Sequence, residues 1–403
     1  MLKILFLSQR VPYPPDRGDR IRSYHILRYL AERHQVSLAA VADERPHPDH
    51  VRALEALCDT VDVEVIVRRR RALAVAGHLA TSVPLTVPVF WSAALKAKID
   101  QRLSAERFDL VFIYCSAMAP YVLSRPTPPK IIDFVDADSQ KWLDYASRAR
   151  SPMKLVYWRE GWLLRRFERR VADACVHAFI ASERDARILR QFAPGCPLTT
   201  LPQGVTIPPP ALTRPEAPTL VFTGVMDYWP NVDAMLYFAR EIFPAVRQRV
   251  PDARLLIVGQ RPSRAVTRLA RTPGITVTGR VPDVLEYLRS AAVFVAPLRI
   301  ARGVQNKVLE AMAAGVPVVC TSAALGDIGA VPNRHVMVAD TPSRFALATS
   351  ALLRNRQRRE RLGRAAAAFI RDNYQWDDQL ARLDAVLGDL ERRQQSHGFQ
   401  PIH

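Results

Sequence analysis

The sequence predicts an α/β protein built from two doubly wound, Rossmann-like domains. Three observations indicate this fold class: short apolar runs alternate with amphipathic segments, a proline-rich stretch interrupts the pattern, and the alternation then restarts. The 403 residues, 49% of them apolar, suffice for two domains with a buried core each. This composition excludes a disordered chain, a fibrous protein and a small disulfide scaffold.

Six apolar runs in the first half have the length and residue types of buried strands. They are residues 3–8, 35–41, 62–67, 109–114, 130–135 and 177–181. Amphipathic helices are expected between them. For example, residues 19–33 would begin at Asp19 as the N-cap and place Ile21, Ile26, Leu27 and Leu30 on one side. This alternation predicts a parallel sheet.

The segment 208–218 contains five prolines in eleven residues, which predicts a linker. Further strands are expected behind it at 220–223, 254–258, 275–278, 293–296 and 318–321, followed by Arg-rich helical segments at 341–371 and 377–393. The predicted organisation is therefore a first domain over 1–207, the linker, a second domain over 219–376, and a C-terminal helix and tail over 377–403.

The net charge of +18 is spread over both halves and favours anionic partners: nucleic acid, nucleotide phosphates or an acidic membrane face. The five cysteines are odd in number and never spaced C-x-x-C, which indicates a reducing, cytoplasmic setting. Residues 3–7 indicate a first buried strand rather than a signal sequence.

Two segments raise the question of membrane contact. Residues 72–95 contain no Lys, Arg, Asp or Glu and follow four arginines, but prolines and glycine argue against a spanning helix. A core-packed helix and loop, or a membrane-surface patch, both fit. Residues 153–170 interleave aromatic with basic residues, as in a membrane-surface helix, a nucleic-acid groove, or a helix with an aromatic core stripe and a solvated basic face.

The stretch 297–319 carries the clearest chemistry, a strand end followed by a glycine turn, a helix and another buried strand. Gly303 would let a phosphate approach the helix N-terminus, with Lys307 and Glu310 on the same helix face. This arrangement suits a nucleotide diphosphate whose ribose meets Glu310. The alternative is a solvated helix face with an ordinary Lys307 to Glu310 pair.

Motifs in both halves follow one another in a familiar order: residues 12–22, 222–231, 256–259, 277–283 and 307–319. This series resembles the family 4 glycosyltransferases of the GT-B fold. Residues 133–142 and 302–307 resemble, more narrowly, the sugar transferases associated with exosortase/PEP-CTERM exopolysaccharide systems.

The resemblance implies two Rossmann-like domains facing across a cleft, an acceptor domain first and a donor domain second. It implies sugar transfer with retention from a nucleotide diphosphate donor to a glycan or lipid-linked acceptor in exopolysaccharide or cell-surface polysaccharide synthesis. No cofactor and no catalytic metal are implied. The residues carried over are donor-binding Gly224, Arg299, Arg302, Gly303, Val304, Gln305, Lys307 and Glu310, acceptor-binding Gly18 and Asp19, and catalytic Asp136 and Asp138.

The sequence departs from the family pattern at two places. Arg302 stands where the first of two glutamates is usual, and the segment 224–231 lacks the usual Arg/Lys pair. Arg299, Arg302 and Lys307 are the candidate replacements for that charge. The aspartates at 133, 136 and 138 would also fit a divalent cation site or simple helix capping.

Three other functions stay open at this point: a nucleotide-sugar epimerase on the same fold, a non-catalytic sugar-nucleotide-binding scaffold, and a nucleic-acid binder. The last has only the net charge in its favour and no recognition motif, so we expect no nucleic-acid partner. The expected location is the cytoplasm, with an anionic membrane surface as a peripheral partner.

Overall fold

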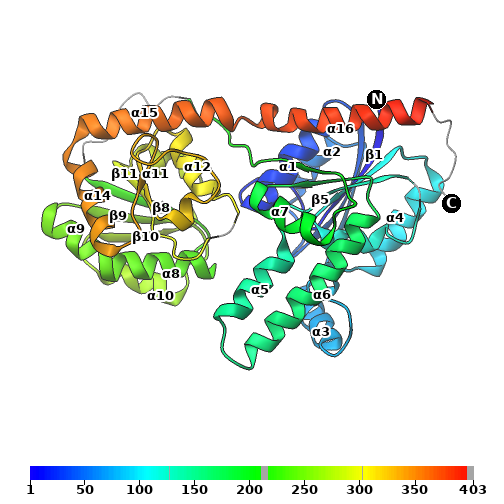
Figure 1. Cartoon of the computed structure of the whole chain (residues 1–403), viewed down its shortest axis with the longest axis horizontal. Helices are drawn as coiled ribbons and strands as arrows, with labels where there is room; N and C mark the ends of the chain where they lie inside the picture. Colours follow the sequence, from blue (N-terminus) through cyan, green and yellow to red (C-terminus); the bar gives the residue numbers. More distant parts are fainter. Residues whose placement is uncertain (127, 210–216, 302, 397–403) are drawn as a thin grey trace. The chain divides into compact units, whose positions relative to one another are not determined.

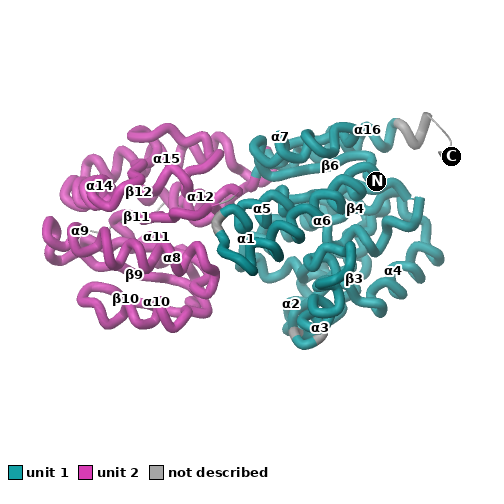
Figure 2. The backbone as a smooth tube through the Cα atoms, turned by 60° about the horizontal axis from the view of Figure 1, so that its bottom comes forward, with its two compact units in different colours: residues 1–202, 379–403 teal, residues 203–378 magenta. Residues whose placement is uncertain are grey.

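A computed structural model describes residues 1–126, 128–209, 217–301 and 303–396. The chain forms two compact units, coloured separately in Figure 2. The first unit contains Met1–Pro202 and the chain from Gln379 onward, and the second contains Gln203–Asp378. The last helix, α16 (Trp376–Ser396), thus begins in the second unit and continues in the first.

The first unit is built on a seven-stranded sheet with the order β3-β2-β1-β4-β5-β6-β7, and every strand pair is parallel. The strands are β1 (Lys3–Ser8), β2 (Gln35–Ala42), β3 (Thr60–Val65), β4 (Leu110–Tyr114), β5 (Lys130–Asp133), β6 (His177–Ile180) and β7 (Leu198–Thr200). Strands β1, β4 and β5 are almost entirely buried because helices cover the sheet, as their continuous apolar runs require.

The helices of the first unit are α1 (Gly18–Ala31), α2 (Pro48–Glu55), α3 (Arg68–His78), η1 (Pro88–Phe90), α4 (Ala93–Ala105), η2 (Ser116–Tyr121), α5 (Asp138–Arg148), α6 (Met153–Asp173) and α7 (Glu183–Phe192). The predicted N-cap of α1 is wrong. The cap is Arg17, and Asp19 lies in the first turn, where the positive end of the helix dipole stabilises a carboxylate.

Helix α16 packs on the first unit through polar contacts. The Tyr29 hydroxyl donates to the Asp384 carboxylate at 2.6 Å, and Arg382 donates to the Thr200 carbonyl at 2.8 Å. The apolar side chains Leu380, Leu383 and Leu387 are buried. Figure 1 shows this helix running along the unit that holds the N-terminus.

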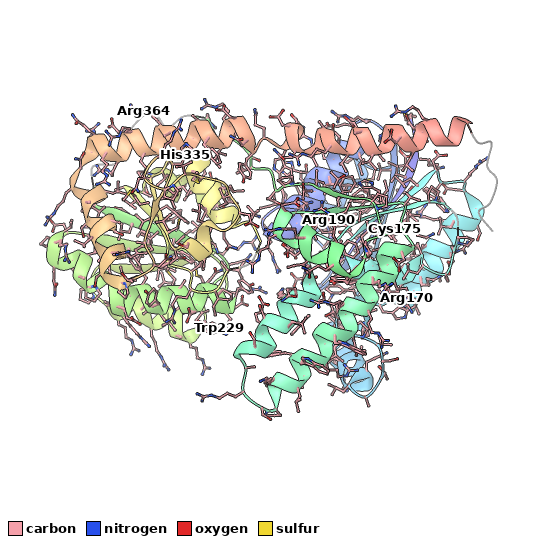
Figure 3. All side chains as sticks on the ribbon, in the orientation of Figure 1. Arg170, Cys175, Arg190, Trp229, His335 and Arg364 are labelled. Carbon is pink, nitrogen blue, oxygen red and sulfur yellow. The ribbon has the colours of Figure 1, made fainter. Side chains whose placement is uncertain are left out.

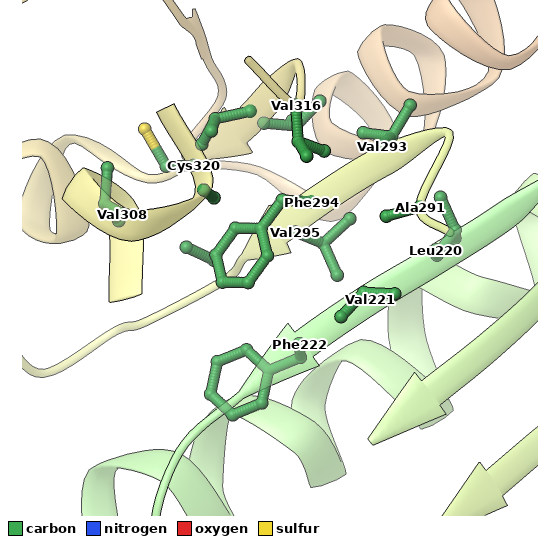
Figure 4. Close-up of a cluster of buried hydrophobic side chains, with 14 of the residues drawn as sticks. Leu220, Val221, Phe222, Ala291, Val293, Phe294, Val295, Val308, Val316 and Cys320 are labelled. Atoms are coloured by element: carbon green, nitrogen blue, oxygen red, sulfur yellow. The ribbon is translucent and has the colours of Figure 1, made fainter. Parts of the chain in front are cut away.

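The second unit has a six-stranded parallel sheet with the order β10-β9-β8-β11-β12-β13. Its strands are β8 (Thr219–Thr223), β9 (Arg254–Val258), β10 (Ile275–Gly279), β11 (Val293–Ala296), β12 (Val318–Cys320) and β13 (Met337–Val338). Figure 4 shows part of the core, in which Phe222 of β8 and Phe294 of β11 stack with ring centroids 6.4 Å apart.

The helices of the second unit are α8 (Trp229–Tyr237), η3 (Phe238–Ile242), α9 (Phe243–Arg249), α10 (Arg264–Arg268), η4 (Leu269–Arg271), α11 (Val284–Arg289), α12 (Asn306–Ala313), α13 (Ser322–Leu325), α14 (Pro342–Arg354) and α15 (Arg356–Asn373). The helical segment expected over 341–371 breaks at Asn355, whose side chain caps α15 by accepting from the Arg358 amide.

Two other expectations concern the proline-rich linker and the uncharged segment 72–95. Residues 210–216 of the expected linker lie outside the described residues. No described helix combines the length and the apolar character needed to cross a bilayer. The uncharged segment 72–95 instead forms the end of α3, a loop, η1 and the start of α4.

Candidate functional site

Glycines join two loops at the carboxyl edge of the second sheet, where open α/β sheets bind their ligands. The Gly224 amide after β8 donates to the Val258 carbonyl at 3.0 Å. A Cβ atom at Gly259 would lie 1.7 Å from the Gly224 carbonyl oxygen, so only glycine allows this approach. Gly224 itself has φ +158°, a backbone conformation that L side chains rarely adopt, and a Cβ atom there would lie 2.7 Å from Asn231 Nδ2.

Asn231 connects the loop after β8 to helix α12. Its amide nitrogen donates to the Val225 carbonyl at 2.9 Å, and its amide oxygen accepts from Lys307 Nζ at 2.7 Å. The Lys307 ammonium also lies 5.3 Å from the centroid of the buried Phe222 ring. The loop and the lysine are therefore held in fixed register by one buried amide.

Lys307 and Glu310 have strongly perturbed acidities. Burial lowers the pKa of Lys307 to about 8, against the opposing effect of Glu310. Burial likewise raises the pKa of Glu310 to about 7, against the opposing effect of Lys307. Both side chains are half-buried, so the pair differs from the fully solvated pair of the alternative. Perturbation of this kind is typical of functional sites.

The glycine turn precedes the helix rather than forming its first turn. Gly303 has φ +61°, in the left-handed region that favours glycine. Val304 and Gln305 are half-buried, and α12 begins at Asn306 with Gln305 as N-cap. The predicted order of a glycine turn and then a helix is thus confirmed, and Lys307 lies in the first turn, where free amides favour anions. Arg302 lies outside the described residues.

Arg299, another expected donor ligand, binds a carboxylate of its own unit. Its Nε donates to Asp233 Oδ2 at 3.0 Å, and a second guanidinium nitrogen lies 2.5 Å from Asp233 Oδ1. The guanidinium also stacks 4.6 Å from the Tyr237 ring centroid. Half of the Arg299 side chain remains exposed, so this cation is oriented toward the surface by a buried carboxylate.

In the first unit, the Asp133 carboxylate at the end of β5 forms a buried ion pair with Arg22 of α1. Arg22 Nε donates to Asp133 Oδ2 at 2.7 Å, and a second nitrogen donates to Oδ1 at 3.2 Å. Asp133 Oδ1 also accepts from the Val135 amide at 3.0 Å, and Val135 has φ +67°. This carboxylate thus shapes the loop that follows, rather than belonging to an open cluster of acids.

Asp136 and Asp138 lie in that loop and at the first position of α5. Burial, followed by the nearby Asp138 and Asp185, raises the pKa of Asp136 to about 7. Lys141 lies 4.0 Å from the Asp138 carboxylate. The N-cap of α5 is Ala137, and the α6 residue Glu168 accepts from the α5 Ser139 amide at 3.1 Å. Neither aspartate is therefore the N-cap residue of α5.

Gly18 and Asp19 lie at the start of α1, after the loop that follows β1. The Asp19 carboxylate pairs with Arg10 Nε at 2.7 Å, and its backbone carbonyl accepts from the Tyr114 hydroxyl at 2.9 Å. The metal alternative for the aspartates finds no support among the described residues, where no group of three or more His, Cys, Asp or Glu could hold an ion.

Sequence reasoning missed Asn231, Asp233, Arg22 and Glu168 as positioning residues. Of these four, only Asn231 could have been found from the sequence, because it closes the motif that begins at Gly224. The partners of the others lie far away in sequence, 111 residues in the case of Arg22 and Asp133, and no local pattern links them.

Comparison with solved structures shows that the chain has the GT-B fold, with two parallel-sheet, Rossmann-like units. Sucrose-phosphate synthase from Thermosynechococcus elongatus superposes with a TM-score of 0.68 at 15% identity, over 98% of this chain and 100% of that one. The Anabaena protein HepE, solved in complex with UDP-glucose, has a TM-score of 0.65 at 14% identity, over 96% of this chain and 100% of its own.

Sequence comparison adds a domain family. Residues 217–355 match the family described as Glycosyl transferases group 1. A GDP-mannose-dependent alpha-(1-6)-phosphatidylinositol monomannoside mannosyltransferase of Mycobacterium tuberculosis is 30% identical over 255 residues, 55% of this chain and 64% of the relative. Its Mycolicibacterium smegmatis counterpart is 28% identical over 250 residues. The match thus covers less than two thirds of these relatives.

Proposed function

We propose that the chain is a glycosyltransferase that moves a sugar from a nucleotide diphosphate donor to a glycan or lipid-linked acceptor. The observation that carries this proposal is the desolvated Lys307 beside Asn231, in the first turn of α12 and within the matched domain. A half-buried ammonium in the first turn of a helix suits a diphosphate, and Glu310 one turn later suits the ribose hydroxyls.

We assign further donor ligands to the same site. Gly224, Gly303, Val304 and Gln305 bring backbone close to the donor, and Arg299 contributes positive charge at the surface. We assign Arg302 to the diphosphate as well, replacing the usual acid. Arg302→Glu would then abolish donor binding, and normal turnover in this variant would contradict the assignment.

The acceptor is placed on the first unit, with Gly18 and Asp19 as contacts and Asp136 or Asp138 as the base. A sugar hydroxyl must lose its proton as the glycosidic bond forms, and a carboxylate or the donor phosphate must accept that proton. We propose retention of the anomeric configuration, a role in exopolysaccharide or cell-surface polysaccharide synthesis related to the exosortase-associated systems, and a cytoplasmic location.

Two measurements test this function. Thermal shifts with UDP, GDP and their sugars identify the donor, because a ligand that binds only the folded state raises its stability. Incubating that donor with glycan and lipid-linked acceptors then tests for a product with a new glycosidic bond. An altered nucleotide sugar without any acceptor would instead indicate an epimerase, and binding without turnover would indicate a scaffold.

A further inference from the structure

One helix of the first unit exposes apolar and cationic side chains along a single stripe. On α6, Leu155, Trp158, Trp162, Arg166 and Arg169 follow at spacings of three or four residues, which places them on one face. The exposed fractions of Leu155, Trp158 and Trp162 are 66%, 55% and 45%. We call these five residues the α6 stripe. The expected aromatic core stripe is thus only half right, because Phe167 is buried and both tryptophans are exposed.

The aromatic part of the stripe is ordered by its own contacts. The rings of Trp158 and Trp162 stack at a centroid distance of 6.4 Å with an interplanar angle of 13°. The Arg166 guanidinium lies 4.3 Å from the Trp162 ring centroid. Because the guanidinium packs on the indole ring, the positive charge of Arg166 stays next to the exposed apolar side chains.

Two of the three acidic residues of α6, Glu160 and Glu168, are buried, and the third, Asp173 at the end of the helix, is exposed and pairs with Arg169 at 3.8 Å. Glu160 is buried and accepts from the Leu85 amide at 2.6 Å and the Thr86 amide at 2.9 Å. Glu168 is buried below α5. These are the only carboxylates between Met153 and Ala172. The exposed face of this segment therefore combines large apolar groups with cations, and the acid beside it, Asp173, pairs with Arg169.

Helix α3 adds to the same surface. Arg159 of α6 donates to the His78 carbonyl at 3.1 Å, which brings the end of α3 beside α6. Leu73 and Leu79 there are 65% and 49% exposed. Figure 1 shows α3 close to α6, and Figure 3 shows Arg170 on α6 near its C-terminal end.

We propose that the α6 stripe, together with Leu79, is the surface by which this chain binds an anionic lipid bilayer. Tryptophan prefers the interface of a bilayer, leucine enters it, and arginine pairs with acidic headgroups. The excess of cations over this single acid favours anionic lipid over a protein surface of mixed charge. This inference goes beyond the proposed function and does not depend on any transfer activity.

Vesicle flotation of the full chain tests the proposal, without nucleotide or acceptor. We expect flotation with phosphatidylcholine vesicles that contain phosphatidylglycerol, none with phosphatidylcholine alone, and a decline as salt increases. Trp158→Ala/Trp162→Ala and Arg166→Glu/Arg169→Glu should each weaken binding at least tenfold while the circular dichroism spectrum and the nucleotide-induced thermal shift stay unchanged.

The matched controls lie in the second unit: Trp229→Ala, whose indole is 59% exposed, and Arg364→Glu/Arg371→Glu on the exposed side of α15 (Figure 3). These should float like the parent. A parent that stays in the soluble fraction at low salt overturns the proposal, as do stripe variants that still float. Loss of self-association in the tryptophan variant without vesicle binding would assign the surface to a second copy instead. Flotation without sugar transfer would refute only the proposed function.

Discussion

Two desolvated charges, one in each unit, have different kinds of partner. In the first unit, the buried Arg22 and Asp133 side chains form a bidentate ion pair. Burial opposes the positive charge of Arg22, but the attraction of Asp133 outweighs it and raises the pKa of Arg22. In the second unit, the hydrogen-bond partner of Lys307 is the neutral amide of Asn231, and burial lowers the pKa of the lysine to about 8.

This difference distinguishes a charge that stabilises the fold from one whose surroundings suit a ligand. A paired charge has its desolvation offset inside the protein, so it fixes the loop after β5 without inviting a further ion. A desolvated cation with a neutral partner gains much more from an added anion, because the surrounding dielectric is low. The first arrangement holds a fold, and the second suits a ligand with phosphate groups.

The largest expected effect tests the structural side of this comparison. Asp133→Leu should lower the free energy of unfolding by about 3–5 kcal/mol, because it leaves Arg22 buried without its counter-ion. Urea unfolding followed by circular dichroism measures the loss. The double variant Arg22→Leu/Asp133→Leu should recover much of it.

The control for this variant is Asp49→Asn, since Asp49 pairs with Arg52 at the surface with both side chains mostly exposed. It should cost less than about 1 kcal/mol. If Asp133→Leu costs no more than this control, the buried pair does not stabilise the first unit.

Changing Lys307 should affect ligand binding rather than folding. Lys307→Met removes a charge-assisted contact worth about 1.5–3 kcal/mol, so the affinity for the nucleotide diphosphate should fall roughly tenfold to one-hundred-fold. Isothermal titration calorimetry measures it. Lys154→Met, at an exposed position of α6, is the matched loss of charge and should bind as the parent does. Equal affinities would place the diphosphate elsewhere.

The Lys307 and Glu310 pair also predicts a pH window. Donor binding needs a protonated lysine, which is lost as pH rises through about 8, and an ionised glutamate, which is lost as pH falls through about 7. Affinity for a nucleotide sugar, whose phosphates stay ionised throughout, should therefore peak between these values. Glu310→Ala should weaken it by about 1–3 kcal/mol and flatten the acidic side. An unchanged acidic side would exclude Glu310 from the site.

The fold could be predicted from the sequence because strands that are buried on both faces form continuous apolar runs. The runs at 3–8, 254–258 and 293–296 coincide with β1, β9 and β11. Strands β7 and β13 were missed because they have three and two residues and lie at the sheet edges, where apolar content is not required.

The candidate site could be predicted from the sequence only where its residues are close to one another along the chain. Gly303, Lys307 and Glu310 lie within one turn and helix, so spacing predicts their proximity. The partners that tune them are distant: Asn231 lies 76 residues from Lys307, and Asp233 lies 66 residues from Arg299. Burial, which shifts the pKa of Lys307 and Glu310, depends on the whole packed unit and leaves no mark in the helix sequence itself.

The smallest expected effect concerns Asp136, which stands between the two cases. Burial, as for Lys307, and then its like-charged neighbours raise its pKa to about 7. A carboxylate with this pKa is a useful base near neutral pH. Asp136→Asn and Asp138→Asn should leave nucleotide affinity intact but lower the transfer rate at least tenfold, about 1.4 kcal/mol in barrier. Transfer by the parent should decline as pH falls through about 7, when Asp136 gains a proton, and Asp136→Asn should lose this decline. If both variants melt earlier yet keep their activity per folded molecule, the aspartates support the loop after β5, and the acceptor base is another group.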